Sequence, residues 1–323
     1  MATSEFELIR RYFTHPARHA LLGVGDDAAL VKVRRGYDLA ISADMLVAGR
    51  HFFADADPRQ LGHKALAVNL SDMAAMGAAP RWATLALALP AADARWVREF
   101  SRGFMALARR FDVDLIGGDT TRGPLNICVQ IMGEVRHGKA LRRDRARSGD
   151  DIWVSGTLGD AALALAALKR RIRLEPVELV QCAARLHRPT PRVALGLALS
   201  GVAHSAIDIS DGLLADLGHI LESSGAGAEI ELADLPVSSV LARYLDRVTA
   251  CSALLAGGDD YELCFTAPRA ARARILRIAL GAKVKATRIG TVRAHRRGAP
   301  RLIVRSPDGA ALRVVRGGFD HFA

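Results

Sequence analysis

Six short segments of the chain carry aspartate beside glycine, serine or other small residues. They read GVGDDAAL (23–30), SADMLVAGRHF (42–52), NLSDMAAMG (69–77), LIGGDTTRG (115–123), AIDISDGL (206–213) and GGDDYEL (257–263). One Asp-Gly pair is usually just a turn. Six such segments, in a chain whose acidic residues are 24 Asp and 10 Glu, indicate short carboxylates on tight turns. Such groups suit divalent metal ions.

The third segment places polar side chains on an apolar helix. In a helix, residues 65, 69, 72 and 76 share one face, so Asn69 and Asp72 lie among Ala and Met side chains. An unpaired carboxylate there costs several kcal/mol or shifts its pKa strongly. Asp72 is therefore expected either to accept local hydrogen bonds or to hold a cation, and the sequence leaves both open.

The fifth segment lies where a predicted strand runs into a predicted helix. Alternation places Asp208 and Ser210 on one side, and Asp211 is expected to cap the helix. A helix N-terminus offers free N–H groups and a positive dipole end, which favour anions. A purely structural cap is the competing interpretation of Asp211.

Two familiar nucleotide motifs are present only as near misses. Gly23-x-Gly25-x-x-Ala28 matches the dinucleotide pattern, but Asp26 and Asp27 would place two anions against a pyrophosphate. Residues 133–139 spell G-x-x-x-x-G-K, but alanine follows where a phosphate loop needs Ser or Thr. We expect a hairpin turn there.

The elements that must position these segments follow from hydrophobic period, caps and turn residues. Asp57 followed by Pro58 begins one long helix and Gly77 ends it. Helices are predicted at 4–14, 57–76, 93–110, 159–170, 176–186, 192–200, 211–223 and 269–279, and strands at 28–33, 37–43, 81–89, 112–117, 125–135, 152–155, 204–209 and 228–232. The basic, turn-rich segment 142–151 predicts a boundary, with domains at 1–140 and 141–323. The alternation indicates an α/β (α+β) chain of two domains.

Composition excludes several classes of protein. Half of the 323 residues are hydrophobic and 24% are charged, as in a folded globular protein. The net charge of +11 comes from 39 Arg and 6 Lys in scattered positions, so we expect an Arg-rich solvated surface and no nucleic-acid partner. A non-catalytic RNA-binding protein would explain the charge but not the Asp segments.

The sequence also predicts the cellular compartment and the state of the cysteines. There is no secretory signal and no apolar run of about 18 residues, so we expect a cytoplasmic protein without a membrane span. The four cysteines are far apart and form no C-x-x-C pair. Buried thiols are therefore expected in place of a zinc site or disulfides.

Read in order, the Asp segments resemble those of the thiamine-monophosphate kinase family, in the superfamily of aminoimidazole ribonucleotide synthetase and selenophosphate synthetase. The likeness runs from SEFELIRRYF through GVGDDAAL, HKALAVNLSDMAAMGA, LIGGDTTRGPL, SAIDISDGLLADLGHI and GGDDYELCF to the closing GGFDHF. It implies an N-terminal α/β domain with a mixed sheet that binds ATP and metal and pairs in a homodimer. It also implies a C-terminal α+β domain that closes over the nucleotide and substrate.

The resemblance also implies roles for single residues. The implied Mg²⁺ ligands are Asp27, Ser42, Ala43 through its main chain, Asp44, Asp72, Asp119, Asp208 and Asp211. The implied ATP contacts are Gly118, Asp119, Arg143 and Ser210, and the implied thiamine phosphate contacts are His51, Asp259 and Phe319. Three positions depart from the family pattern, where Thr is common at 43, Glu at 259 and Trp or Tyr at 319.

The implied reaction needs no catalytic side chain. A phosphate monoester has a second pKa of about 6, so at neutral pH it is mostly a dianion that needs no general base. Repulsion between it and ATP is the obstacle, which several Mg²⁺ ions and Arg143 would reduce. We expect direct in-line transfer that gives thiamine diphosphate.

A sister enzyme of the superfamily is the alternative activity. Selenophosphate synthetase activity would lead us to expect a reactive cysteine or selenocysteine near the N-terminus. It is disfavoured because the first cysteine of this chain is Cys128. Aminoimidazole ribonucleotide synthetase is disfavoured only by the resemblance.

Overall fold

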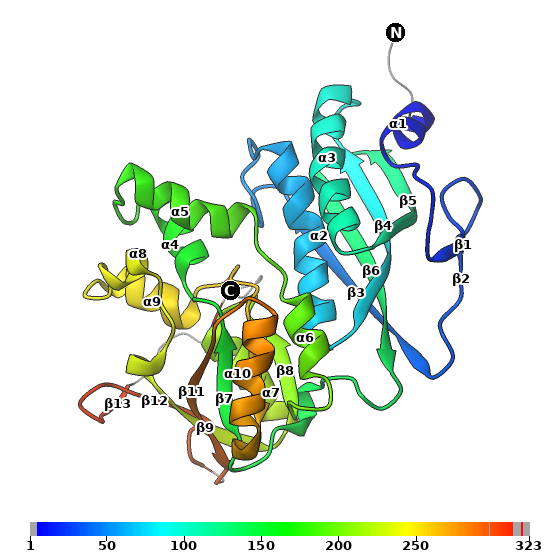
Figure 1. The fold of residues 1–323 in the computed structure, drawn as a ribbon. Coiled ribbons are helices and arrows are strands. Elements are labelled where there is room, and N and C mark those ends of the chain that lie inside the picture. The colour runs from blue at the N-terminus through cyan, green and yellow to red at the C-terminus, as the bar shows by residue number, and fades with distance from the viewer. Residues whose placement is uncertain (1–4, 297, 313–317, 319–323) are drawn as a thin grey trace. The chain divides into compact units, whose positions relative to one another are not determined.

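The computed structural model describes residues 5–296, 298–312 and 318. The chain forms two compact units (Figure 1). The N-terminal unit comprises residues 1–73 and 78–138, and the C-terminal unit comprises residues 74–77 and 139–323. Within the described residues, no helix has the length and apolar character that crossing a bilayer requires.

The N-terminal unit is built on a mixed four-stranded sheet in the order β3-β6-β4-β5, in which only β4 and β5 run parallel. A short antiparallel pair, β1 and β2, precedes it. The elements are α1 (Glu5–Tyr12), β1 (Ala20–Leu22), β2 (Leu30–Val31), β3 (Tyr37–Val47), α2 (Pro58–Ala75), β4 (Ala79–Leu89), α3 (Ala94–Arg110), β5 (Asp114–Arg122) and β6 (Asn126–Arg136).

Helices α2 and α3 lie side by side and touch backbone to backbone (Figure 1). A Cβ added at Gly62 would lie 2.1 Å from the carbonyl oxygen of Phe100, and one at Gly103 would lie 1.9 Å from that of Arg59. Glycine at both positions therefore lets the two helices approach more closely than any side chain allows. This contact fixes where α2 lies against α3, and α2 carries Asp72.

The two faces of this sheet differ sharply in burial. Ile127, Val129 and Ile131 of β6 are at most 1% exposed and form the inner face. On the outer face of β3, Ile41 and Met45 are 57% and 55% exposed. Alternation thus gives β3 one buried face, shared with α2, and one open apolar face.

The C-terminal unit is built on a seven-stranded sheet in the order β13-β12-β9-β11-β7-β10-β8, in which only β12 and β9 run parallel. Its strands are β7 (Asp151–Ser155), β8 (Ser205–Asp208), β9 (Ala226–Glu231), β10 (Leu263–Ala267), β11 (Ala286–Ala294), β12 (Leu302–Arg305) and β13 (Ala311–Leu312). Its helices are α4 (Asp160–Leu168), α5 (Pro176–His187), α6 (Val193–Leu199), α7 (Leu213–Ser223), α8 (Ser239–Ala242), α9 (Val248–Ala256) and α10 (Arg272–Gly281), with 3-10 turns η1 (Arg143–Arg145), η2 (Leu232–Asp234) and η3 (Arg269–Ala271).

Both faces of the central strands are buried. One face joins Ile152 of β7 and Ile207 of β8 to Leu217 of α7 in the main apolar cluster. On the other face Trp153 stacks on Phe265, with ring centroids 6.4 Å apart. Strands buried on both faces read as continuous apolar runs, and IWV (152–154) of β7 and LCF (263–265) of β10 are such runs.

Several predicted elements have different bounds in the structure. The strand predicted at 37–43 continues to Val47, and the one predicted at 112–117 starts at Asp114 and continues to Arg122. The segments around Asp44 and Asp119 are therefore strands, because cross-strand pairing overrides the local turn chemistry there. The prediction for 28–33 was too long, since only Leu30–Val31 is a strand.

The other differences are smaller. Helices α8 and α9 had no counterpart among the predicted elements. The segment 133–139 contains the end of β6 and a turn at Gly138, where φ is +67°, and not a phosphate loop. Ser4 of the predicted first helix lies outside the described residues, and the helix is described from Glu5.

Candidate functional site

In the N-terminal unit the structure brings two predicted ligands into contact. The Ser42 hydroxyl of β3 donates a 2.5 Å hydrogen bond to Oδ2 of Asp72 on α2. Asp44, two residues along the same strand, shares the face of Ser42 by alternation. Three oxygen donors from two elements thus gather on the inner side of β3.

Asn69 lies one turn before Asp72 and is fully buried. Its Nδ2 donates to the Ala65 carbonyl at 3.0 Å, but its Oδ1 has no hydrogen-bond partner within the described residues. An orphaned buried acceptor is costly. Of the two predicted alternatives for Asp72, the structure shows a hydrogen bond within the protein. On the same helix face, Oδ1 of Asn69 is an oxygen that no described residue uses.

The remaining N-terminal ligand candidates are placed on other segments or face another side. Asp27 is exposed in the loop between β1 and β2. Asp119 is exposed on β5, which is separated from β3 by two strands, or about 14 Å at usual strand spacing. Ala43 faces away from Ser42 and Asp44 on β3, so only its main chain could join them.

Gly118 precedes Asp119 on β5 and packs against Leu85 of β4. Its φ is +147°, and an added Cβ would lie 1.9 Å from the carbonyl oxygen of Leu85. No other residue fits this position without moving β4. Gly118 therefore determines where Asp119 leaves the strand.

His51 lies in the turn after β3. Its Nδ1 accepts a 2.9 Å hydrogen bond from the Val47 N–H. In the neutral ring the proton is therefore on Nε2, which makes that nitrogen the donor atom of the ring. That donor is suited to a phosphate or a polar ring atom.

In the C-terminal unit a carboxylate that the sequence analysis missed organises the Ser210 loop. Oδ2 of Asp216 accepts the N–H groups of Ser210, Asp211 and Gly212 at 3.0, 3.1 and 3.0 Å. Burial raises the pKa of Asp216 to about 7, against the effect of these donors. Helix α7 begins after Gly212, so the prediction that Asp211 caps it was wrong. The side chain of Asp211 is thus not needed as a cap.

The Asp259 loop packs directly on this loop. The Asp259 N–H donates to the Ser210 carbonyl and the Tyr261 N–H to the Ile209 carbonyl, both at 2.8 Å. The Tyr261 hydroxyl donates to Oδ1 of Asp259 at 3.1 Å. Asp208 ends β8 beside them and is 4% exposed. Four predicted site residues, Asp208, Ser210, Asp211 and Asp259, are therefore close together.

Two further carboxylates, Asp260 and Glu262, follow Asp259 in the chain and anchor this segment by hydrogen bonds inside the unit. Glu262, fully buried, accepts from Ser155 and Arg185 at 2.5 Å each and from Nε of Arg192 at 2.6 Å. Asp260 accepts the Gly159 N–H, and burial raises its pKa well above the usual range. The block GGDDYEL signalled these residues, but sequence alone did not separate buried acids from exposed ones.

Arg143 lies in η1, which packs against α7 and β8. Its carbonyl accepts from the Ser224 hydroxyl at 2.8 Å, and its side chain is exposed. The guanidinium group therefore extends from an anchored backbone. Phe319, the third predicted substrate contact, lies outside the described residues.

Within the part of the chain that the structure describes, no three His, Cys, Asp or Glu side chains are grouped closely enough to hold a metal ion. The chemistry of the donors nevertheless fits magnesium, because carboxylate, hydroxyl and carbonyl oxygens are its usual ligands. The unused Oδ1 of Asn69 beside Asp72 fits the same preference. All four cysteines are free, and burial raises the pKa of Cys182 to about 12, so no thiolate site competes.

Comparison with known families covers both units. The N-terminal domain of the AIR synthase related proteins matches residues 25–135, and their C-terminal domain matches residues 147–303. Thiamine-monophosphate kinase of Escherichia coli (strain K12) is 48% identical to this chain over 328 residues. That alignment covers 100% of this chain and 99% of the relative.

Solved structures give the same result. Thiamine-monophosphate kinase from Stenotrophomonas maltophilia K279a has a TM-score of 0.86 at 48% identity, covering 97% of this chain and 99% of that chain. AaThiL complexed with AMPPCP and TMP has a TM-score of 0.76 at 32% identity, covering 93% and 92%.

Proposed function

This chain belongs to the thiamine-monophosphate kinase family, and from that premise we propose that it phosphorylates thiamine monophosphate with ATP. The products are thiamine diphosphate and ADP. The observation that carries the proposal is the end-to-end similarity, which spans both groups of oxygen donors. The AaThiL complex with AMPPCP, an ATP analogue, and TMP supports the same pair of substrates.

Magnesium is the metal proposed for the oxygen donors. Its ligands would be Asp27, Ser42, the Ala43 main chain, Asp44, Asp72 and Asp119 of the N-terminal unit, and Asp208 and Asp211 of the C-terminal unit. When bound, Mg²⁺ neutralises phosphate charge and aligns the transferred group. The Ser42 hydrogen bond holds the Asp72 carboxylate in one orientation before any ion arrives. This limits the reorganisation that binding requires.

The chain itself binds and orients the substrates. Gly118, Asp119, Arg143 and Ser210 are the proposed ATP contacts, and His51, Asp259 and Phe319 the proposed contacts of thiamine phosphate. In the neutral His51 ring the proton lies on Nε2, because Nδ1 accepts the Val47 N–H. Tyr261 holds the Asp259 carboxylate, which is one methylene shorter than the Glu usual in the family.

No side chain is proposed as a general base. The acceptor phosphate is mostly a dianion at neutral pH, because its second pKa is about 6. Transfer is therefore direct and in line, without a phospho-enzyme, and Arg143 lowers the repulsion between the two anions. The reaction is assigned to the cytoplasm, where ATP is available.

A homodimer through the outer face of the N-terminal sheet completes the proposal. Leu39, Ile41 and Met45 of β3 are 37%, 57% and 55% exposed, and β3 is an edge strand. Exposed apolar side chains along an edge strand favour association. A second copy of the chain is the occupant that the family resemblance implies.

The test of the activity is mass-spectrometric detection of thiamine diphosphate after incubation with thiamine monophosphate, ATP and Mg²⁺. Asp72→Asn is expected to lower kcat/KM at least about 100-fold, because it removes one negative ligand without changing size. Asp55→Asn, an exposed change in the same unit, is the matched control and should leave activity unchanged.

Three results would contradict parts of the proposal. If the protein binds ATP with Mg²⁺ but forms no product, its substrate is that of another enzyme in the superfamily. Full activity in Asp72→Asn would refute the metal assignment. A covalent mass increase of one phosphoryl group on the protein after mixing with ATP would refute direct transfer.

A further inference from the structure

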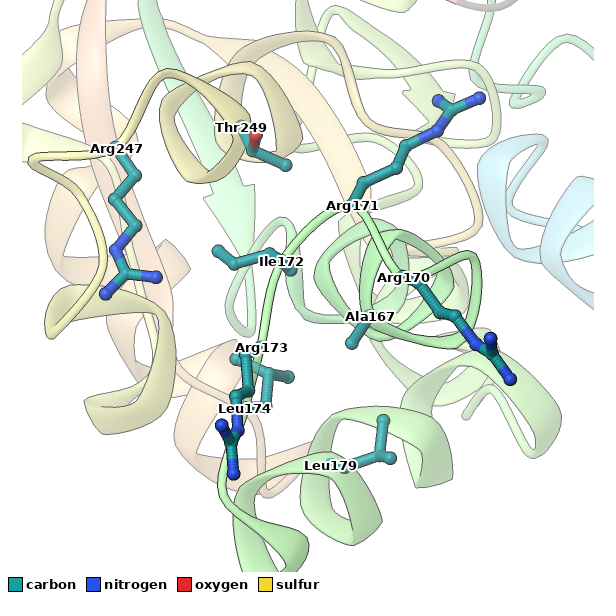
Figure 2. Close-up of a pocket in the computed structure, with 9 residues that line it drawn as sticks. All are labelled: Ala167, Arg170, Arg171, Ile172, Arg173, Leu174, Leu179, Arg247 and Thr249. Atoms are coloured by element: carbon teal, nitrogen blue, oxygen red, sulfur yellow. The ribbon is translucent and has the colours of Figure 1, made fainter.

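The C-terminal unit contains a pocket of about 510 Å³ that none of the described site candidates lines (Figure 2). It is formed by the loop after α4 and by the first residues of α5 and α9. Four arginines, Arg170, Arg171, Arg173 and Arg247, line it together with apolar Ile172 and Leu174. The volume is in the usual range for small-molecule sites, about 300–1,000 Å³.

Among the residues that the structure describes, no carboxylate lines this pocket. Of the acids nearest along the chain, Glu175 and Glu178 are used elsewhere, whereas Asp246 directly precedes Arg247 but does not line the pocket. Glu175 caps α5 in a capping box with Glu178, and Glu178 also binds Arg243 and the Tyr244 hydroxyl. The positive charge of the pocket is therefore not neutralised by these two carboxylates.

The guanidinium groups at the pocket are also uncommitted. Within the described residues, Arg170, Arg171 and Arg173 form no ion pair. Some other surface arginines of this chain do pair, as Arg102 does with Glu99 and Arg142 with Asp144. Unpaired guanidinium groups around a concave surface are suited to bidentate binding of phosphate.

The four side chains divide into two pairs. Figure 2 shows Arg173 and Arg247 extending on one side of Ile172, and Arg170 and Arg171 extending on the opposite side, away from them. The Arg247 guanidinium stacks over the Tyr244 ring at 5.1 Å, which restricts its orientation. Arg173 and Arg247 are therefore the two pocket arginines that lie on one side of Ile172.

The backbone at Arg247 adds to this preference for anions. Arg247 is the N-cap of α9, makes no side-chain capping bond, and is followed by a first turn without acidic residues. Thr249 of that turn lines the pocket. The positive end of the helix dipole therefore faces no carboxylate from the first turn of α9, and Asp246, just before the N-cap, is exposed.

We propose that this pocket is a second anion site, which binds a small organic phosphate through Arg173 and Arg247. The apolar Ile172 and Leu174 contact the organic part of the ligand. Because guanidinium groups neutralise the phosphates directly, binding needs no divalent metal. In this respect the pocket differs from the Asp-built site, where phosphate would meet carboxylates without the metal.

The experiment is isothermal titration calorimetry of the full chain in EDTA at physiological salt, with ADP and inorganic pyrophosphate as probes. The wild type is expected to bind one ADP per chain, and more tightly than pyrophosphate. The variant R173A/R247A should bind ADP at least about 10-fold more weakly. The matched control R170A/R171A removes the same charge from the same pocket and should weaken binding less than about 3-fold, because screening limits its long-range effect.

Folding is checked by the thermal unfolding midpoint of each variant, which should stay close to the wild-type value because all four arginines are exposed. Equal weakening in the two double variants would overturn the proposal in favour of general electrostatic attraction. So would the absence of saturable binding in EDTA, or binding that appears only with Mg²⁺. ADP binding no tighter than pyrophosphate would overturn the assignment to an organic phosphate. None of these results depends on whether the chain phosphorylates thiamine monophosphate.

Discussion

Replacing Asp216 with alanine removes the carboxylate oxygen that accepts the N–H groups of Ser210, Asp211 and Gly212. Each bond contributes about 1–1.5 kcal/mol to stability, and the three share one oxygen. Ser210 and Asp211 are only half-buried, so water can replace part of the loss, whereas the N–H of buried Gly212 is left without an acceptor. The burial cost of the carboxylate, visible in its raised pKa, is recovered at the same time. The expected loss in free energy of unfolding is therefore about 2–3 kcal/mol.

Urea denaturation followed by circular dichroism measures this loss, and Glu222→Ala is the matched control. Glu222 lies on the same helix but is exposed, so its replacement should change stability by less than about 0.5 kcal/mol. The Ser210 loop should also loosen, which raises KM for ATP in Asp216→Ala. A loss below about 1 kcal/mol with an unchanged KM would refute the idea that Asp216 organises the loop.

Three further outcomes are expected. Gly103→Ala should lower the free energy of unfolding by about 1–3 kcal/mol in chemical denaturation, because the new Cβ would lie 1.9 Å from the Arg59 carbonyl oxygen. An unchanged free energy of unfolding would show that α2 and α3 can separate without loss of stability. Ile41→Asp should shift the chain to a monomer in light scattering, since it places a charge on the apolar outer face, and an unchanged mass would place any dimer elsewhere. Burial raises the pKa of Asp160 above its ordinary value, so the folded state holds the extra proton and stability falls as pH rises through the window between the two values. The stability of Asp160→Asn relative to wild type should therefore increase as pH rises through that window, and a difference independent of pH would contradict this cause.

Much of the fold was predictable because it is encoded locally. The Pro58 start and Gly77 stop of the long helix, and the apolar periods of α3 and β6, depend on residues close in sequence. The strand ends were less predictable. Val47 and Arg122 lie in strands because β6 and β4 pair with them across the sheet, a contact between distant residues.

The same division holds for the candidate site. Residue type and order were sufficient to single out the Asp segments and to expect a partner for Asp72, since a carboxylate on an apolar helix face must be paired. The identity of that partner, Ser42, depends on how β3 packs against α2. Likewise, Asp208, Ser210 and Asp259 were named from the sequence, but nothing local indicated that Asp216 holds their loop.

By itself, the sequence determined which oxygen donors this protein has, in which short segments they lie and which family it resembles. Only the tertiary structure decided which carboxylates are buried supports, such as Asp216 and Glu262, and which are exposed, such as Asp27 and Asp119. It also decided that Arg173 and Arg247, far apart in the chain, line one pocket. The physical reason is that residue type sets the chemistry of a side chain, whereas burial, hydrogen bonding and local charge are properties of the packed environment.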